Sequence, residues 1–122
     1  METPVAKMIV MFKRKAGLTM EQFIDYYETR HVPLILSISS RCSAYKRNYV
    51  RDAFLKAHAE GAATNPDPDV VTEIHFRTQA DFDSFLADCN KQNDVIVRDE
   101  QNFVDRSTIR GYVVSETSSG LG

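Results

Sequence analysis

His31 is the side chain in this 122-residue sequence that is best suited to acid–base chemistry. An imidazole both takes up and releases protons near neutral pH. His31 falls on a helical stripe whose other members are all apolar or aromatic, at a position where leucine would serve packing better. The alternative interpretation is a core histidine whose ring bonds to backbone freed by a nearby proline. The stripe comprises Met20, Phe23, Ile24, Tyr27, His31, Leu34, Ile35 and Ile38.

Two tyrosines precede this histidine. Tyr27 lies four residues before His31 and therefore on the same face of the predicted helix. A phenol hydroxyl can donate a hydrogen bond to a substrate oxygen that gains negative charge, so Tyr27 and Tyr26 are candidates for that role. Both also suit a packing role with the hydroxyl satisfied inside the protein. The predicted catalytic residues are His31, Tyr27 and Tyr26.

The helix that positions these residues is expected to begin at Thr19 and to run to about Leu36. Thr19 can cap it, with Gln22 at the third helical position completing a modest capping box. Pro33 cannot donate to residue 29, and its ring clashes with that carbonyl. The residue before a proline is also biased away from helical angles. We therefore expect the helix to kink or pause next to His31.

A second group of candidates comes from polar side chains on the expected strands. Strand 41–50 alternates so that its two tyrosines share a side, and strand 70–77 places a histidine between two charged residues on one side. The alternative interpretation is a solvated ladder of charges and a weak surface ion pair. The predicted substrate-binding residues are Tyr45, Tyr49, His75, Asp105 and Arg110.

Composition argues against several classes of protein. Fifteen basic and seventeen acidic residues give a formal charge of −2, which does not favour a nucleic-acid partner. No apolar run approaches the roughly 18 residues that span a bilayer, and the N-terminus does not resemble a signal peptide. Cys42 and Cys89 lie outside any CxxC pattern, so we expect reduced thiols and a cytoplasmic location. Scattered histidines and the lack of a GxGxxG or Walker pattern predict neither a metal nor a cofactor.

The order of elements predicts an α+β, ferredoxin-like βαββαβ fold with an antiparallel sheet. Strands are expected at 5–12, 41–50, 70–77 and 105–115, and a second helix after its cap at Thr78. Residues 51–62 suggest a short helix before a loop at 62–69, and residues 94–104 suit a short helix plus a turn. Residues 1–115 are expected to form one domain, with 116–122 as a disordered tail.

The first strand is apolar on both sides, because Met8, Val10 and Phe12 oppose Ile9 and Met11. Helices cover only one face of such a sheet, so the other face requires a partner. We expect a homodimer that packs sheet against sheet. Polar residues expected on the second face would line a pocket or rim inside the dimer: Tyr45, Arg47, Tyr49, Glu73, His75, Arg110 and Tyr112.

Two motifs resemble those of the EthD-domain family. The first is a KRK-x-G turn at 13–17 followed by F-x-x-Y-Y/W-x-x-x-H-x-P, carried by Phe23, Tyr26, Tyr27, His31 and Pro33. The second is an acidic D-E-x-x-F-x-D segment at Asp99, Glu100, Phe103 and Asp105. The resemblance covers residues 7–114. This chain departs from the family at Tyr27, where tryptophan is frequent, and in a longer insertion at 51–69.

The resemblance implies a dimeric α+β barrel with a ligand pocket between helices and sheet. Its superfamily includes cofactor-free dehydratases, decarboxylases, lactone isomerases and small monooxygenases that act on aromatic or polyketide-like rings. The first hypothesis is therefore a cofactor-independent lyase or isomerase acting on a small aromatic, lactone or polyketide-like substrate. The alternatives are a non-catalytic small-molecule-binding or accessory module and a cofactor-free monooxygenase of phenolic rings.

Overall fold

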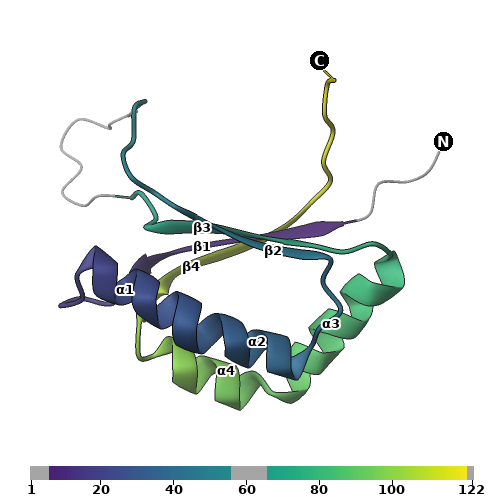
Figure 1. The fold of residues 1–122 in the computed structure, drawn as a ribbon, viewed down its shortest axis with the longest axis horizontal. Coiled ribbons are helices and arrows are strands. Elements are labelled where there is room, and N and C mark those ends of the chain that lie inside the picture. Colours follow the sequence, from purple (N-terminus) through teal and green to yellow (C-terminus); the bar gives the residue numbers. More distant parts are fainter. Residues whose placement is uncertain (1–5, 56–65, 121–122) are drawn as a thin grey trace.

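The computed structural model describes residues 6–55 and 66–120, which form one antiparallel sheet with helices on one of its faces (Figure 1). The predicted α+β ferredoxin-like fold is confirmed, with strand order β2-β3-β1-β4. The strands are β1 Lys7–Arg14, β2 Ala44–Tyr49, β3 Val70–His75 and β4 Val104–Val114. The helices are α1 Met20–Tyr26, the π turn η1 Tyr27–His31, α2 Val32–Ile38, α3 Gln79–Lys91 and α4 Asn93–Glu100. Across the described ranges, no helix combines the length and apolar character that crossing a bilayer requires.

The first helical segment carries the predicted cap and the predicted irregularity. The Thr19 hydroxyl accepts from the Gln22 N–H at 3.1 Å, and the Gln22 side chain accepts from the Thr19 N–H at 2.9 Å. The irregularity beside His31 takes the form of the π turn, in which the backbone N–H of Val32 reaches back to the carbonyl of Tyr27. Pro33 follows in the first turn of α2, where its missing N–H is tolerated. The segment continues to Ile38, two residues beyond the expected end.

Strand pairing corrects one prediction about the sheet. Directly paired residues share a face, and β2 pairs Tyr45 with Ile74 and Tyr49 with Val70. These β3 partners belong to the hydrophobic core, so the β2 tyrosines face the helices. Glu73, His75, Arg110 and Tyr112 lie on the opposite face. The expectation that all seven polar residues share one face was wrong for Tyr45, Arg47 and Tyr49, because alternation defines two faces without saying which one meets the helices.

The connecting segments differ in part from the expectation. Residues 51–55 form no helix, and the remainder of the short helix suggested at 51–62 extends into 56–65, outside the described residues. The ambiguous segment 94–104 resolves into α4, a turn at 101–103 and the start of β4. Residues 116–120 carry no helix or strand.

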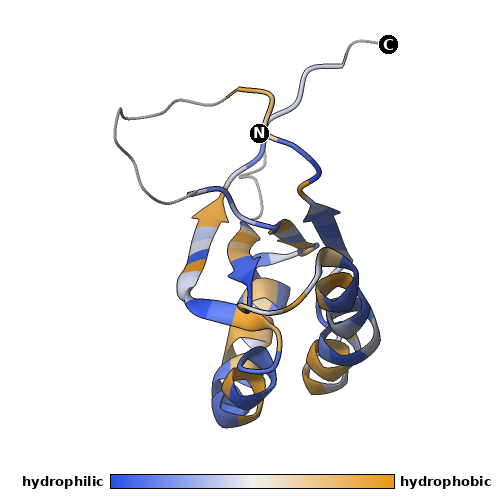
Figure 2. Ribbon diagram, turned by 90° about the vertical axis from the view of Figure 1, so that its left-hand side faces the viewer, coloured by the Kyte–Doolittle hydropathy of each residue, from blue (hydrophilic) through white to orange (hydrophobic). Residues whose placement is uncertain are grey.

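The buried core consists of two hydrophobic clusters, and Phe103 lies at the centre of the first. Its side chain is fully buried, and its ring centroid lies 4.9–6.0 Å from five neighbouring rings. A second apolar cluster fills the other end of the layer between sheet and helices. Hydrophobic and hydrophilic segments alternate along the helices, as expected for elements with one buried face (Figure 2). The rings around Phe103 are those of Phe12, Phe23, Tyr26, Tyr27 and His31.

A cluster centred on Glu28 joins the π turn to the outer strand β2. The Arg47 guanidinium donates to both Glu28 carboxylate oxygens, at 2.8 and 2.7 Å, and the Tyr49 hydroxyl donates to one of them at 2.5 Å. The paired Arg47 lowers the pKa of Glu28. Burial, followed by the bond to Glu28, raises the pKa of Tyr49, so this phenol stays protonated. The ionised Glu28 therefore fixes the edge strand against η1.

This cluster makes part of the stability dependent on pH. Because the pKa of Glu28 in the folded protein lies below its ordinary value of 4.5, the stabilisation is present above that value and is lost as pH falls through the lowered one. We expect Glu28→Gln to melt at a lower temperature than wild type at pH 7, with the difference shrinking below about pH 4. Thermal melts from pH 7 to 3 test this, with the exposed Glu21→Gln as control. A difference that persists unchanged to pH 3 would contradict it.

Candidate functional site

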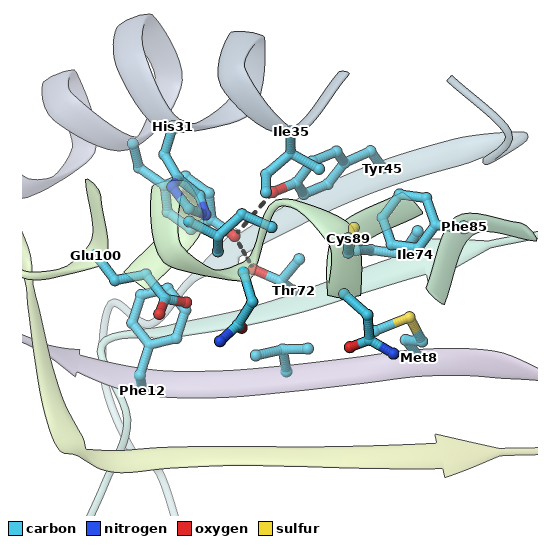
Figure 3. Close-up of a pocket in the computed structure, with 15 residues that line it drawn as sticks. Met8, Phe12, His31, Ile35, Tyr45, Thr72, Ile74, Phe85, Cys89 and Glu100 are labelled. Atoms are coloured by element: carbon cyan, nitrogen blue, oxygen red, sulfur yellow. Dashed lines mark hydrogen bonds between the residues drawn. The ribbon is translucent and has the colours of Figure 1, made fainter. Parts of the chain in front are cut away.

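A cavity of about 190 Å³ lies between the helices and the sheet (Figure 3). Its walls are mostly apolar, with Met8 and Ile74 from the sheet and Ile35 and Phe85 from the helices. Polar groups enter this apolar space at a few positions, which is the usual character of a small-molecule site. They belong to Tyr27, His31, Tyr45, Thr72, Asn90, Asn93 and Glu100.

His31 lines the cavity and bonds to a carboxylate on the other half of the chain. Its Nδ1 lies 2.8 Å from Oδ2 of Asp99, and the histidine is only 6% exposed. An ionised carboxylate only accepts hydrogen bonds, so Nδ1 carries the proton in a neutral ring and Nε2 keeps its lone pair. The Phe103 ring packs against the imidazole, with centroids 4.9 Å apart. This arrangement fixes both the tautomer and the orientation of the ring.

Tyr26 supports the same carboxylate from the other side. Its hydroxyl donates to Oδ1 of Asp99 at 2.6 Å and accepts from the Asn102 side chain at 2.9 Å. Burial, followed by the bond to Asp99, raises the pKa of Tyr26. Each carboxylate oxygen of Asp99 thus has its own donor. Tyr26 is not among the residues that line the cavity, and its proton is directed at Asp99.

Three hydroxyls form a chain along the cavity wall, marked by the dashed lines in Figure 3. The Tyr27 oxygen lies 2.7 Å from that of Thr72 and, at a longer 3.4 Å, from that of Tyr45. Burial raises the pKa of Tyr27 and of Tyr45, so both remain proton donors. The three hydroxyls have three protons, and the two contacts use two of them. One O–H, on Thr72, Tyr27 or Tyr45, is therefore left to donate to a ligand oxygen.

The remaining residues predicted from the sequence lie elsewhere. Tyr49 faces the helices but directs its hydroxyl to Glu28. His75 lies on the open face of the sheet, with its ring 3.2 Å from Glu73. Asp105 accepts from Ser107, and Arg110 donates to backbone carbonyls of its own strand. Both line a separate hollow of about 430 Å³ beside β1, away from His31.

The sequence did not predict four polar residues that line the cavity, Thr72, Asn90, Asn93 and Glu100, or Asp99, which bonds to His31. Asp99 and Glu100 belong to the acidic motif, and their segment was expected to form a short helix plus a turn, but the sequence did not show how that helix is oriented toward His31. Thr72 had a usable signal, because it is the polar member of an otherwise apolar strand face. A threonine hydroxyl at a core position requires a partner, and that partner is Tyr27.

The donor set at the cavity favours proton transfer over thiolate or metal chemistry. Burial raises the pKa of the cavity-lining Cys89 to about 11, so its thiol stays protonated and is a weak nucleophile. In the part of the chain that the structure describes, no three side chains of the metal-binding types converge. The arrangement of His31 with an orienting carboxylate and a nearby hydroxyl donor suits general acid–base chemistry.

Comparison with known proteins identifies the family. The model of the EthD domain matches residues 15–107, which confirms the resemblance inferred from the sequence. A solved EthD-like protein of Ralstonia eutropha JMP134 is 21% identical, with a TM-score of 0.56, covering 93% of this chain and 90% of its own. The At3g17210 protein of Arabidopsis thaliana is 11% identical, with a TM-score of 0.57, covering 95% and 99%. At these identities the likeness shows the fold alone. Comparison with curated proteins gives no significant match.

Replacing Asp99 tests whether the two halves of the chain depend on this contact. In Asp99→Asn the side chain keeps one acceptor oxygen, so either Tyr26 or His31 loses its partner. We expect a loss of about 1.5–3 kcal/mol in the free energy of unfolding, as for hydrogen bonds to a charged group. Urea unfolding measures it. Asp25→Asn, at an exposed site on α1, is the matched control and should stay within about 0.5 kcal/mol of wild type.

Proposed function

The chain belongs to the EthD-domain family, and on that premise we propose that it is a cofactor-independent lyase or isomerase. Its substrate is a small aromatic, lactone or polyketide-like ring that carries an oxygen next to an acidic C–H bond. Family membership by itself assigns no reaction. The observation that carries the proposal is the buried His31 ring, held by Asp99 at 2.8 Å beside a mostly apolar cavity.

The polar groups of the cavity suit removal of a proton from carbon. Nε2 of His31 takes the proton from the carbon beside a ring carbonyl, and the electron pair of the C–H bond moves onto the carbonyl oxygen. The free O–H of the Tyr27 hydroxyl chain stabilises that oxygen as an oxyanion hole does. Asp99 accepts the hydrogen bond from Nδ1 and holds the imidazolium in place.

The same proton then completes either reaction. In an isomerase, the imidazolium returns the proton to a different carbon of the ring. In a dehydratase, it delivers the proton to a departing hydroxyl group, and water leaves as a new double bond forms. Both outcomes conserve atoms and electrons between the ring and His31, so the proposed chemistry requires no other reactant.

Deuterium exchange tests the proton-transfer step without knowledge of the natural substrate. We expect wild-type protein in D₂O to accelerate exchange of the C–H bonds beside the carbonyl of 2-tetralone, followed by proton NMR. His31→Ala should lower the protein-catalysed rate by about 100-fold or more, the range of general-base catalysis. Added imidazole should restore part of the rate to His31→Ala, whereas Asp25→Asn should exchange at the wild-type rate. Equal rates for wild type and His31→Ala would refute the assignment.

A non-catalytic binding module is the second candidate, and one observation favours it. The hydroxyls of Tyr26 and Tyr27, the two phenols predicted to act on substrate, are both bonded within the protein. A pocket whose two predicted phenol donors are already bonded can hold a ring without changing it. The two candidates differ in the exchange experiment, because a binding module takes up 2-tetralone but leaves its C–H bonds unchanged.

The open face of the sheet supports a homodimer as the assembly of this protein. Ile9, Met11 and Val71 lie on that face and are only partly buried, and Tyr112 beside them is 51% exposed. Lys7, Glu73 and His75 add a polar border, in which the Lys7 ammonium and a ring nitrogen of His75 each lie 3.2 Å from a Glu73 carboxylate oxygen. A second copy packed sheet against sheet would cover this face by twofold symmetry.

Light scattering coupled to size exclusion tests the assembly. We expect wild type to have the mass of two chains and Ile9→Lys to have the mass of one, because a buried lysine at the centre of the interface has no partner. Leu36→Lys, on an exposed position of α2, should remain dimeric. A single-chain mass for wild type, or a dimeric Ile9→Lys, would contradict the proposal.

A further inference from the structure

Glu100 is a second carboxylate at the cavity that the proposed reaction does not use. It is the last residue of α4, directly after Asp99, and it lines the cavity together with His31. Figure 3 shows the Glu100 side chain among the residues that line the cavity, together with His31 and Thr72. The Glu100 side chain is 18% exposed, so it is largely withdrawn from water.

The carboxylate of Glu100 is only partly occupied by protein partners. Its Oε1 lies 3.2 Å from Nε of Arg106, whose side chain is 44% exposed. Such an exposed partner is well screened by solvent and neutralises a carboxylate weakly. Arg106 does not line the cavity, so a ligand would meet Glu100 rather than the guanidinium.

A carboxylate in this position discriminates between ligands in two ways. It accepts hydrogen bonds but cannot donate them, so it favours a ligand O–H group. It also repels a ligand anion, and repulsion is stronger in an apolar cavity than in water. Asp99 adds a second negative charge behind His31. Apart from the His31 imidazole, the other polar residues of the cavity wall carry hydroxyls and amides, and among its described residues neither lysine nor arginine occurs.

We propose that Glu100 is the specificity-determining residue of this cavity: it accepts a hydroxyl of an uncharged ring and excludes carboxylates and other anions. The ligand class is therefore a neutral hydroxylated ring, such as a phenol, a hydroxylated lactone or an enol, in preference to an aromatic acid. The inference rests on the proposed function only in taking the cavity as the ligand site. It concerns recognition and holds whether or not His31 moves a proton.

Two pairs of probes separate charge from hydrogen bonding. Nitrobenzene and benzoate have nearly the same shape but differ in charge, whereas phenol and anisole differ in the O–H donor. Titrations at pH 7 followed by protein-observed NMR report affinity and also place each probe, through the amide signals of Thr72 and Ile74 in the cavity wall. The decisive quantity is the change in each preference between wild type and Glu100→Gln, which keeps the shape and removes the charge.

We expect wild type to prefer nitrobenzene to benzoate and phenol to anisole. Glu100→Gln should reduce both preferences by about tenfold or more, a change typical of losing a hydrogen bond to a charged group. Arg106→Gln keeps Glu100 but removes its screening partner, so it should strengthen both preferences. Glu21→Gln, at an exposed position on α1, should change neither. Well-dispersed spectra of each variant establish that the fold is intact.

Preferences that stay within twofold of wild type in Glu100→Gln would overturn the proposal, as would benzoate binding as tightly as nitrobenzene. Failure of every probe to shift the cavity signals would also overturn it, because the cavity would then not be a ligand site. The exchange experiment with 2-tetralone remains a separate measurement. A protein that selects neutral probes through Glu100 yet exchanges no deuterium retains this recognition role and loses only the proposed catalysis.

Discussion

The contact between His31 and Asp99 is the constraint on which the rest of the site depends. It joins residues 68 positions apart, one on the π turn of the first half of the chain and one on α4 of the second half. Both carboxylate oxygens of Asp99 have donors, and Phe103 packs against the imidazole from the turn that follows α4. A titratable ring in an apolar layer is costly unless it is bonded, and here a single carboxylate bonds and orients it.

The π turn and the aromatic cluster explain why this contact forms. The π turn η1 places Tyr27 and His31 on the buried side together, with relative exposures of 2% and 6%. Their ring centroids are 5.5 Å apart in an edge-to-face arrangement. Pro33 then starts the next α-helical turn. The local irregularity therefore positions the His31 ring on one side of the cavity and the Tyr27 hydroxyl toward Thr72 on the sheet.

Much of the fold, and the local structure around His31, could be predicted from the sequence. The helical stripe, the cap at Thr19, the irregularity near Pro33 and the order of strands and helices all follow local rules of spacing and backbone chemistry. Such rules act over a few residues, which is why they work without tertiary information. The sequence did not predict which side of β2 faces the helices, because that depends on the register between β2 and β3.

The partners of the site residues were harder to infer for the same reason. The helix α4 forms the first part of the weakly patterned segment 94–104. The position of this helix brings Asp99 to His31 and Glu100 to the cavity. Tyr26 and Tyr27 look equivalent in the sequence, yet one bonds to a carboxylate and the other to a threonine hydroxyl. Spacing places side chains on a face, whereas long-range packing decides what each one touches.

The nitrogen chemical shifts of the His31 ring test the central claim most directly. In wild type at about pH 8.5, where an ordinary imidazole is neutral, a long-range proton–nitrogen NMR spectrum should show a protonated Nδ1 and an unprotonated Nε2. That tautomer leaves a lone pair available for proton transfer and follows from the bond to Asp99. A spectrum with the proton on Nε2, or with both tautomers equally populated, would contradict the account of His31 as a base held by Asp99.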